Sequence, residues 1–186
     1  MKKVLLLHGY NGIPPVFNYL NEELKKLQYD VIMPSLPIKE NIRYDTWERE
    51  LESIIRELEG ELIVIAHSCS NPFLIKYLSD SKLNVKLYIG LAGFSNHFVK
   101  EGRKDLEKTM ESLIPSEDEI DNFKYNVKAK FCIYSDNDHL VPFEILKQHV
   151  KNIEGQDYMI PNVGHMGNRS NLQELPQVIE IVNKEG

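Results

Sequence analysis

The chain has 186 residues, of which 42% are hydrophobic and 27% charged, and its formal net charge is -6. This balance is typical of one globular domain, which we expect to span residues 1–186. The acidic net charge argues against nucleic acid or an anionic membrane as the main partner, because both are recognised by basic patches.

Short apolar runs recur along the chain, and the first lies at Val4–Leu7. It is too short for the apolar region of a signal peptide, so we expect a buried strand there. Further runs follow at 31–33, 62–65, 87–91, 131–134 and 157–160. Several are apolar at consecutive positions, which is typical of parallel strands covered on both faces. None approaches the roughly 20 residues needed to span a bilayer.

Between these runs, apolar residues recur every three or four positions, as on one face of a helix. The segments cover 17–27, 47–58, 73–78, 146–153 and 175–182. Alternating strands and helices predict βαβ units and a mostly parallel sheet with helices on both faces. Residues 93–128 contain no clear strand, and we expect one or two helices there, lying partly over the functional site.

Polar residues follow four of the predicted strands, at the edge where open parallel sheets form their sites. Ser68 lies in Ile65-Ala66-His67-Ser68-Cys69-Ser70, between a strand and a helix. This segment resembles the nucleophile elbow G-x-S-x-G, in which a sharp, strained turn exposes the serine hydroxyl. Ala66 and Ser70 replace the glycines and are small enough for the turn. A helix N-cap is the alternative role for a serine here.

Two further motifs supply an acid and a base. Asp138 begins Asp-His-Leu-Val-Pro after the fifth apolar run, and Asp136 is its rival, with an Asx turn as the other role for an aspartate there. His165 follows Gly164 after the sixth run; a loop histidine without a role is the alternative. The order Ser68, Asp138, His165 is the nucleophile, acid and base order of α/β-hydrolases.

These residue types suit acyl transfer. A serine hydroxyl needs a base to accept its proton during attack, which we assign to His165, while Asp138 would orient and stabilise the imidazole. We expect the backbone N–H groups of Cys69 and Tyr10 to form the oxyanion hole. A mechanism with Cys69 as nucleophile is a minor alternative. His8 and His67 are interpreted as structural supports.

Together the motifs resemble the single-domain serine hydrolases of the α/β-hydrolase superfamily grouped with retinoblastoma-binding protein nine and bacterial YdeN-like proteins. The likeness covers nearly the whole chain. It rests on His8-Gly9, the helix around Trp47, the Ser68 elbow, residues 138–142 and Gly164-His165. It implies a three-layer α/β/α sandwich whose six-stranded parallel sheet has the order 2-1-3-4-5-6. This would be a minimal α/β-hydrolase fold without a separate cap domain, with no metal and no cofactor.

The expected activity is hydrolysis of a small carboxylic ester, or of an amide or thioester, through an acyl-enzyme. Candidate substrate-binding residues are Tyr10, Asn11, Phe94 and Val141. One alternative is a catalytically weak protein that uses the fold as a protein- or ligand-binding module. Another is a nucleotide-binding doubly wound domain, but the glycine motifs of such domains are missing.

The expected partner is a small-molecule ester or amide; a protein partner stays open, because no motif for one is visible. The two cysteines, Cys69 and Cys132, form neither a disulfide framework nor a zinc-binding spacing. A reducing, cytoplasmic location is therefore expected.

Overall fold

A computed structural model describes residues 2–170 and 172–186. Its sheet has six parallel strands in the order β2-β1-β3-β4-β5-β6. This order is the predicted one, and each strand overlaps the apolar run that indicated it. The strands are β1 (Lys3–Leu7), β2 (Asp30–Ile32), β3 (Glu61–His67), β4 (Asn84–Leu91), β5 (Ala129–Tyr134) and β6 (Gln156–Met159).

Helices connect successive strands, and a last helix follows β6. They are α1 (Val16–Lys26), α2 (Tyr44–Ser53), α3 (Ser70–Ser79), α4 (Lys104–Leu113), α5 (Glu117–Asn126), α6 (Phe143–Ile153) and α7 (Pro176–Glu185), with 3₁₀ turns η1 (Lys39–Asn41) and η2 (Ile55–Leu58). The helix expected at 47–58 is divided into α2 and η2. The break falls at two β-branched isoleucines, Ile54 and Ile55, whose helix propensity is low.

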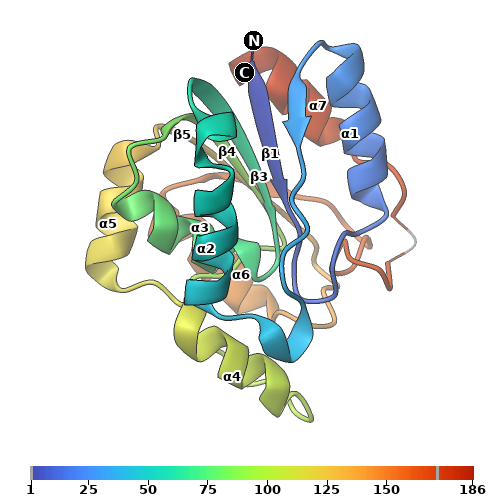
Figure 1. Cartoon of the computed structure of the whole chain (residues 1–186). Helices are drawn as coiled ribbons and strands as arrows, with labels where there is room; N and C mark the ends of the chain where they lie inside the picture. Colours follow the sequence, from blue (N-terminus) through green and yellow to red (C-terminus); the bar gives the residue numbers. More distant parts are fainter. Residues whose placement is uncertain (1, 171) are drawn as a thin grey trace.

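The helices cover both faces of the sheet (Figure 1). Helices α1 and α7 pack on one face, where the buried cluster includes Phe17, Leu20 and Val178. Helices α2, α3, α5 and α6 cover the other face, with Trp47 and Phe73 in their cluster. Nearly all residues of β1, β3 and β4 are buried, on both faces of the sheet, which explains why apolar residues stand at consecutive positions.

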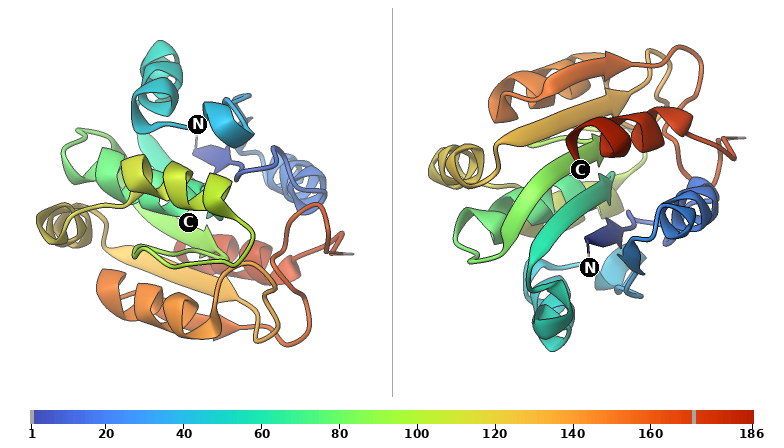
Figure 2. Two further views of the ribbon diagram at one scale, coloured as in Figure 1. Left: turned by 90° about the horizontal axis from the view of Figure 1, so that it is seen from below. Right: turned by 90° about the horizontal axis from the view of Figure 1, so that it is seen from above.

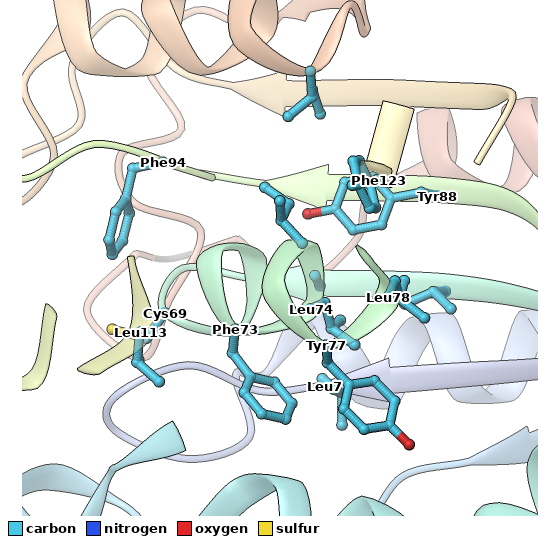
Figure 3. Packing of buried hydrophobic residues seen from close by; sticks show 14 of the residues in the cluster. Leu7, Cys69, Phe73, Leu74, Tyr77, Leu78, Tyr88, Phe94, Leu113 and Phe123 are labelled. Atoms are coloured by element: carbon cyan, nitrogen blue, oxygen red, sulfur yellow. The ribbon is translucent and has the colours of Figure 1, made fainter. Parts of the chain in front are cut away.

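Helix α3 is held firmly between neighbouring elements. Phe73 and Tyr77 lie side by side on the helix (Figure 3), with ring centroids 5.9 Å apart. Trp47 of α2 meets the Phe73 ring edge-on at 5.3 Å and donates a 2.8 Å hydrogen bond to the Pro37 carbonyl. This packing fixes the helix that follows Ser68.

The two helices inside residues 93–128 have different positions. Helix α4 lies beyond the carboxyl ends of the strands (Figure 1) and crosses in front of that end of the sheet when seen from below (Figure 2). Helix α5 packs beside α3 instead, where Asn126 donates to the carbonyls of Leu78 and Ser79. Among the described residues, no helix is both long and apolar enough to cross a membrane.

Candidate active site

Ser68 occupies a tight turn between β3 and α3. Its φ of 56° lies in the left-handed region that side chains other than glycine rarely adopt, as a nucleophile elbow requires. The Ser68 N–H donates to the carbonyl of Leu91 at 2.9 Å, which ties the turn to the end of β4. The serine is 5% exposed. The sequence prediction of a strained elbow agrees with this geometry.

The Ser70 side chain, which stands where the usual elbow motif has a glycine, is held by hydrogen bonds. Its hydroxyl accepts from the His67 N–H at 2.8 Å and lies 2.8 Å from the Leu7 carbonyl, to which it can donate. It therefore joins the elbow to the end of β1. Gly9 provides the space for this approach, because a Cβ there would lie 2.8 Å from the Ser68 Cβ.

A buried amide that the sequence analysis did not identify supports the elbow from below. Asn71 donates to the carbonyl of Ser68 at 2.9 Å and to that of Leu91 at 3.3 Å. Its own oxygen accepts a 2.6 Å hydrogen bond from the Tyr88 hydroxyl. The available sequence signal was a single asparagine close to the apolar residues Phe73 and Leu74.

The structure brings the three residues expected at the reacting centre into one hydrogen-bonded line. His165 Nε2 lies 2.9 Å from Ser68 Oγ, and His165 Nδ1 lies 2.7 Å from Asp138 Oδ2. The imidazole and the carboxylate are almost fully buried. With Nδ1 protonated and donating to the carboxylate, Nε2 is the atom available to accept the serine proton.

Asp138 is held by more than the histidine. Its Oδ1 accepts from the N–H groups of Leu140 at 2.8 Å and Val141 at 3.0 Å. Burial raises the pKa of Asp138, but the hydrogen bond and attraction from His165, with the two amides, lower it by more, so that the net shift is downward. The carboxylate is therefore ionised at neutral pH.

The rival aspartate has a different contact. Asp136 Oδ1 accepts from the Asn162 N–H at 2.9 Å. The neighbouring Ser135 and Asn137 side chains accept from the next two amides, those of Val163 and Gly164. Residues 135–137 thus align the loop that carries His165 with the loop that carries Asp138.

Two further histidines act as supports. His67 Nε2 lies 2.9 Å from the carbonyl of His165, so this nitrogen carries the proton and donates it. Burial lowers the pKa of His67 to about 3, with the neighbouring His165 acting in the same direction. Neutral His67 therefore links the elbow to the His165 loop. His8 Nε2 accepts from the Leu36 N–H at 3.1 Å, which joins the loop after β1 to the segment before α2.

The two residues expected to supply oxyanion donors are Cys69, which directly follows Ser68, and Tyr10, which lines the same cavity as the serine. Burial raises the pKa of the Cys69 thiol to about 12. With so high a pKa the thiolate is scarce at neutral pH, which disfavours Cys69 as the nucleophile.

A cavity of about 630 Å³, measured with its open mouth, lies over Ser68 and His165. All four expected substrate-binding residues, Tyr10, Asn11, Phe94 and Val141, line it. Other lining residues were not identified from the sequence: Gly12, Phe98, Arg103, Leu106, His139, Leu140, Gly167, Asn168 and Arg169. Phe98, Arg103 and Leu106 come from the segment before α4 and its first turn, so residues 93–128 do contribute a wall.

Tyr10 and the start of α4 are joined at this wall. The Tyr10 hydroxyl donates to Asp105 Oδ2 at 2.6 Å, and the Arg103 guanidinium lies 5.2 Å from the Tyr10 ring centroid. Within residues 2–170 and 172–186, no cluster of three or more histidine, cysteine, aspartate or glutamate side chains could hold a metal ion.

Comparisons with known proteins identify the family and the fold. A family model described as serine hydrolase matches residues 4–184. YdeN of Bacillus subtilis (strain 168) is 23% identical over 97% of this chain and 94% of its own length. The crystal structure of the ydeN gene product superposes with a TM-score of 0.86 at 21% identity, over 100% of this chain and 98% of that one.

A more distant match extends the likeness in fold. A structure from work on carboxylesterases of the thaumarchaeon Nitrososphaera gargenis has a TM-score of 0.74 at 13% identity, covering 98% of this chain and 89% of that one. Because the family model spans almost the whole sequence, the assignment does not depend on the distant match. The chain belongs to the serine hydrolase family, has the α/β-hydrolase fold and is a hydrolase similar to YdeN.

Proposed function

We propose that the chain hydrolyses small carboxylic esters through an acyl-enzyme, with Ser68 as nucleophile, His165 as general base and Asp138 as the group that orients the imidazole. The observation that carries the proposal is the line from Asp138 Oδ2 through His165 to Ser68 Oγ, at 2.7 and 2.9 Å. Both distances are within the reach that proton transfer needs.

In the first half of the reaction, Ser68 Oγ attacks the ester carbonyl carbon while His165 Nε2 takes the hydroxyl proton. The carbonyl oxygen becomes negative and accepts hydrogen bonds from the N–H groups of Tyr10 and Cys69. The intermediate then collapses, the C–O bond to the alcohol breaks, and His165 returns its proton to the leaving oxygen. Ser68 is left acylated.

The second half repeats these steps with water. His165 takes a proton from the water as its oxygen attacks the acyl carbon, and the resulting intermediate expels Ser68 Oγ, which regains the proton. The product is a carboxylic acid. Asp138 keeps its charge throughout, and the ion pair that it forms with the transient imidazolium lowers the energy of both transition states.

The walls of the cavity support a substrate with an apolar part. Phe94, Phe98, Leu106, Leu140 and Val141 offer carbon surface on the side of α4 and of the loop before α6. Tyr10 and Asn11 lie on the loop after β1, and the Tyr10 hydroxyl donates to Asp105 of α4. A short acyl chain would exclude water from the apolar side, which strengthens the hydrogen bonds to the oxyanion.

A fluorophosphonate probe tests the nucleophile directly. We expect covalent labelling of the wild-type chain at Ser68, detected by intact mass and peptide mapping, and its loss in Ser68→Ala and His165→Ala. Ser53→Ala is the matched control, because Ser53 is exposed at the end of α2, away from the cavity. Labelling that persists in folded Ser68→Ala would refute the assignment.

The reaction class is tested with short-chain p-nitrophenyl esters, the corresponding anilides and acyl thioesters. We expect turnover of the esters with a burst of p-nitrophenol if deacylation is slow. A folded wild-type chain that forms no probe adduct and turns over none of these compounds would contradict the proposed activity and favour a ligand-binding role.

A further inference from the structure

We propose that the substrate carries a carboxylate and that Arg169, at the mouth of the cavity, binds it. This inference rests on the proposed ester hydrolysis and narrows its substrate class to esters with an anionic group beyond the scissile bond. Arg169 would then be a specificity-determining residue, with no part in the bond-breaking steps.

The first support is that the charged side chains lining the cavity are opposite in sign to the net charge of the whole chain. The chain carries a net charge of -6, yet the charged residues that line the cavity are Arg103 and Arg169. Among the described lining residues there is no aspartate or glutamate. An acidic protein that places its local positive charge at the entrance to its reacting centre favours the entry of anions.

The two arginines are in different states. Arg103 is paired with Asp105, which accepts from its Nε at 3.0 Å and from its Nη2 at 2.9 Å. Arg169, by contrast, forms no salt bridge with any of the residues that the structure describes. Its charge is therefore not neutralised by the protein and remains available to a ligand.

The backbone that carries Arg169 is held in place beside the reacting centre. The turn from Gly167 to Ser170 is closed by a 3.0 Å hydrogen bond between its ends, which the Ser170 hydroxyl reinforces at 2.7 Å. Asn168 donates to the carbonyl of Asn11 at 3.2 Å. This contact joins the Arg169 turn to the loop after β1, on the polar side of the cavity.

His139 lines the same cavity as Arg169. Its ring lies 6.2 Å from that of His165. Burial and then His165 lower the pKa of His139, Asp138 opposes them, and Arg169 and Lys100 add to the lowering. The Arg169 charge therefore acts in the direction that an entering carboxylate would offset.

The apolar wall and Arg169 together describe a bipartite substrate. Phe94, Phe98 and Leu106 suit a hydrocarbon part, while a guanidinium suits a carboxylate, which it can bind through two parallel hydrogen bonds. The carboxylate could belong to the acyl part or to the alcohol part of the ester. Both sources share the same chemistry at Arg169, and they can be distinguished by experiment.

The test compares charged and neutral esters in wild type, Arg169→Gln and Arg169→Lys. The acyl arm uses monoethyl adipate against ethyl hexanoate, followed by proton release. The alcohol arm uses para-acetoxybenzoate against phenyl acetate. Arg49→Gln is the matched control, because Arg49 is an exposed arginine of α2 that does not line the cavity and its loss changes the net charge equally.

We expect Arg169→Gln to lower kcat/KM for the charged ester of one arm roughly fivefold, mainly through KM, because an exposed ion pair contributes modestly to binding. The kcat/KM values for the neutral esters should not change. Arg169→Lys should recover part of the loss, and added salt should reduce the wild-type preference for the charged ester. Arg49→Gln should behave as wild type.

Two results would count against the inference, and they are distinguishable. If wild type hydrolyses the neutral esters and Arg169→Gln leaves the ratio of charged to neutral kcat/KM unchanged in both arms, Arg169 does not bind a carboxylate and the inference is wrong. If wild type hydrolyses no ester and forms no fluorophosphonate adduct, the proposed function itself fails, and the inference fails with it.

Discussion

The substitution Gly9→Ala tests the contribution of the proposed oxyanion hole to catalysis separately from that of the rest of the site. A Cβ at residue 9 would lie 2.8 Å from the Ser68 Cβ and 3.0 Å from both His67 Nδ1 and the His67 carbonyl oxygen. Ordinary contacts begin at 3.4 Å, and all three atoms belong to the elbow. The loop after β1 must therefore move away from Ser68, and the adjacent Tyr10 N–H must move with it.

The displacement should lower both kcat and the free energy of unfolding. Loss of one oxyanion donor costs about 3 kcal/mol of activation free energy, or roughly a hundredfold in kcat. KM should change little, because the charge on the oxygen develops only in the transition state. Overpacking at a tight contact should also lower the free energy of unfolding by about 1–3 kcal/mol.

Steady-state kinetics on a short-chain p-nitrophenyl ester and urea unfolding measure the two effects separately. Gly60→Ala is the control: its φ of 103° strains any side chain, but no atom lies within 4 Å of the added Cβ. It should destabilise the fold and leave kcat unchanged. A folded Gly9→Ala protein with wild-type kcat would refute the argument that this contact positions the Tyr10 amide.

Three further outcomes follow from the same contacts. Asp138→Asn should lower kcat by roughly 10⁴-fold with a small change in KM, because the neutral amide no longer holds the correct tautomer of His165; near-normal kcat would contradict the role of Asp138. Tyr88→Phe removes the 2.6 Å donor to Asn71 and should cost about 1–3 kcal/mol in urea unfolding, because the buried amide oxygen loses its partner; unchanged stability would refute this. Burial lowers the pKa of His149 to about 3 from an ordinary 6.5, so its contribution to stability is present above about pH 6.5 and lost as the pH falls toward 3. His149→Leu should therefore flatten the fall of the urea midpoint with acidity, and an equally steep fall would contradict this.

The sheet could be predicted because its central strands are buried on both faces. In β3, six of the seven residues are buried, so the apolar run is visible without any knowledge of partners. The residues proposed to react could also be predicted, since Ser68, Asp138 and His165 each follow a strand and parallel strands end at one edge. The Asp-His-Leu-Val-Pro spacing favoured Asp138 over its rival Asp136, and it is Asp138 that contacts His165 Nδ1.

Such sequence patterns could not predict contacts between residues that are far apart in the chain. Tyr10 and Asp105 are 95 residues apart, and nothing in either local sequence indicates that the hydroxyl donates to the carboxylate. The same holds for Tyr88 and Asn71, which meet only because β4 and α3 pack together. Arg169 was likewise invisible as a lining residue, because its position depends on the turn at Gly167–Ser170.

The serine at position 70 shows how the departure from the usual elbow is compensated. A glycine there would serve close packing, but Ser70 is fully buried and its hydroxyl accepts from the His67 N–H and can donate to the Leu7 carbonyl. Both partners lie at strand ends, where the backbone groups lack hydrogen-bond partners on a neighbouring strand. A buried polar group without a partner costs about 1–3 kcal/mol. The Ser70 hydroxyl therefore stabilises the elbow at a position where the usual motif has a glycine. The elbow thus keeps its geometry by bonding β1 to β3 through a side chain, which also fixes the distance between Ser68 and the Tyr10 loop.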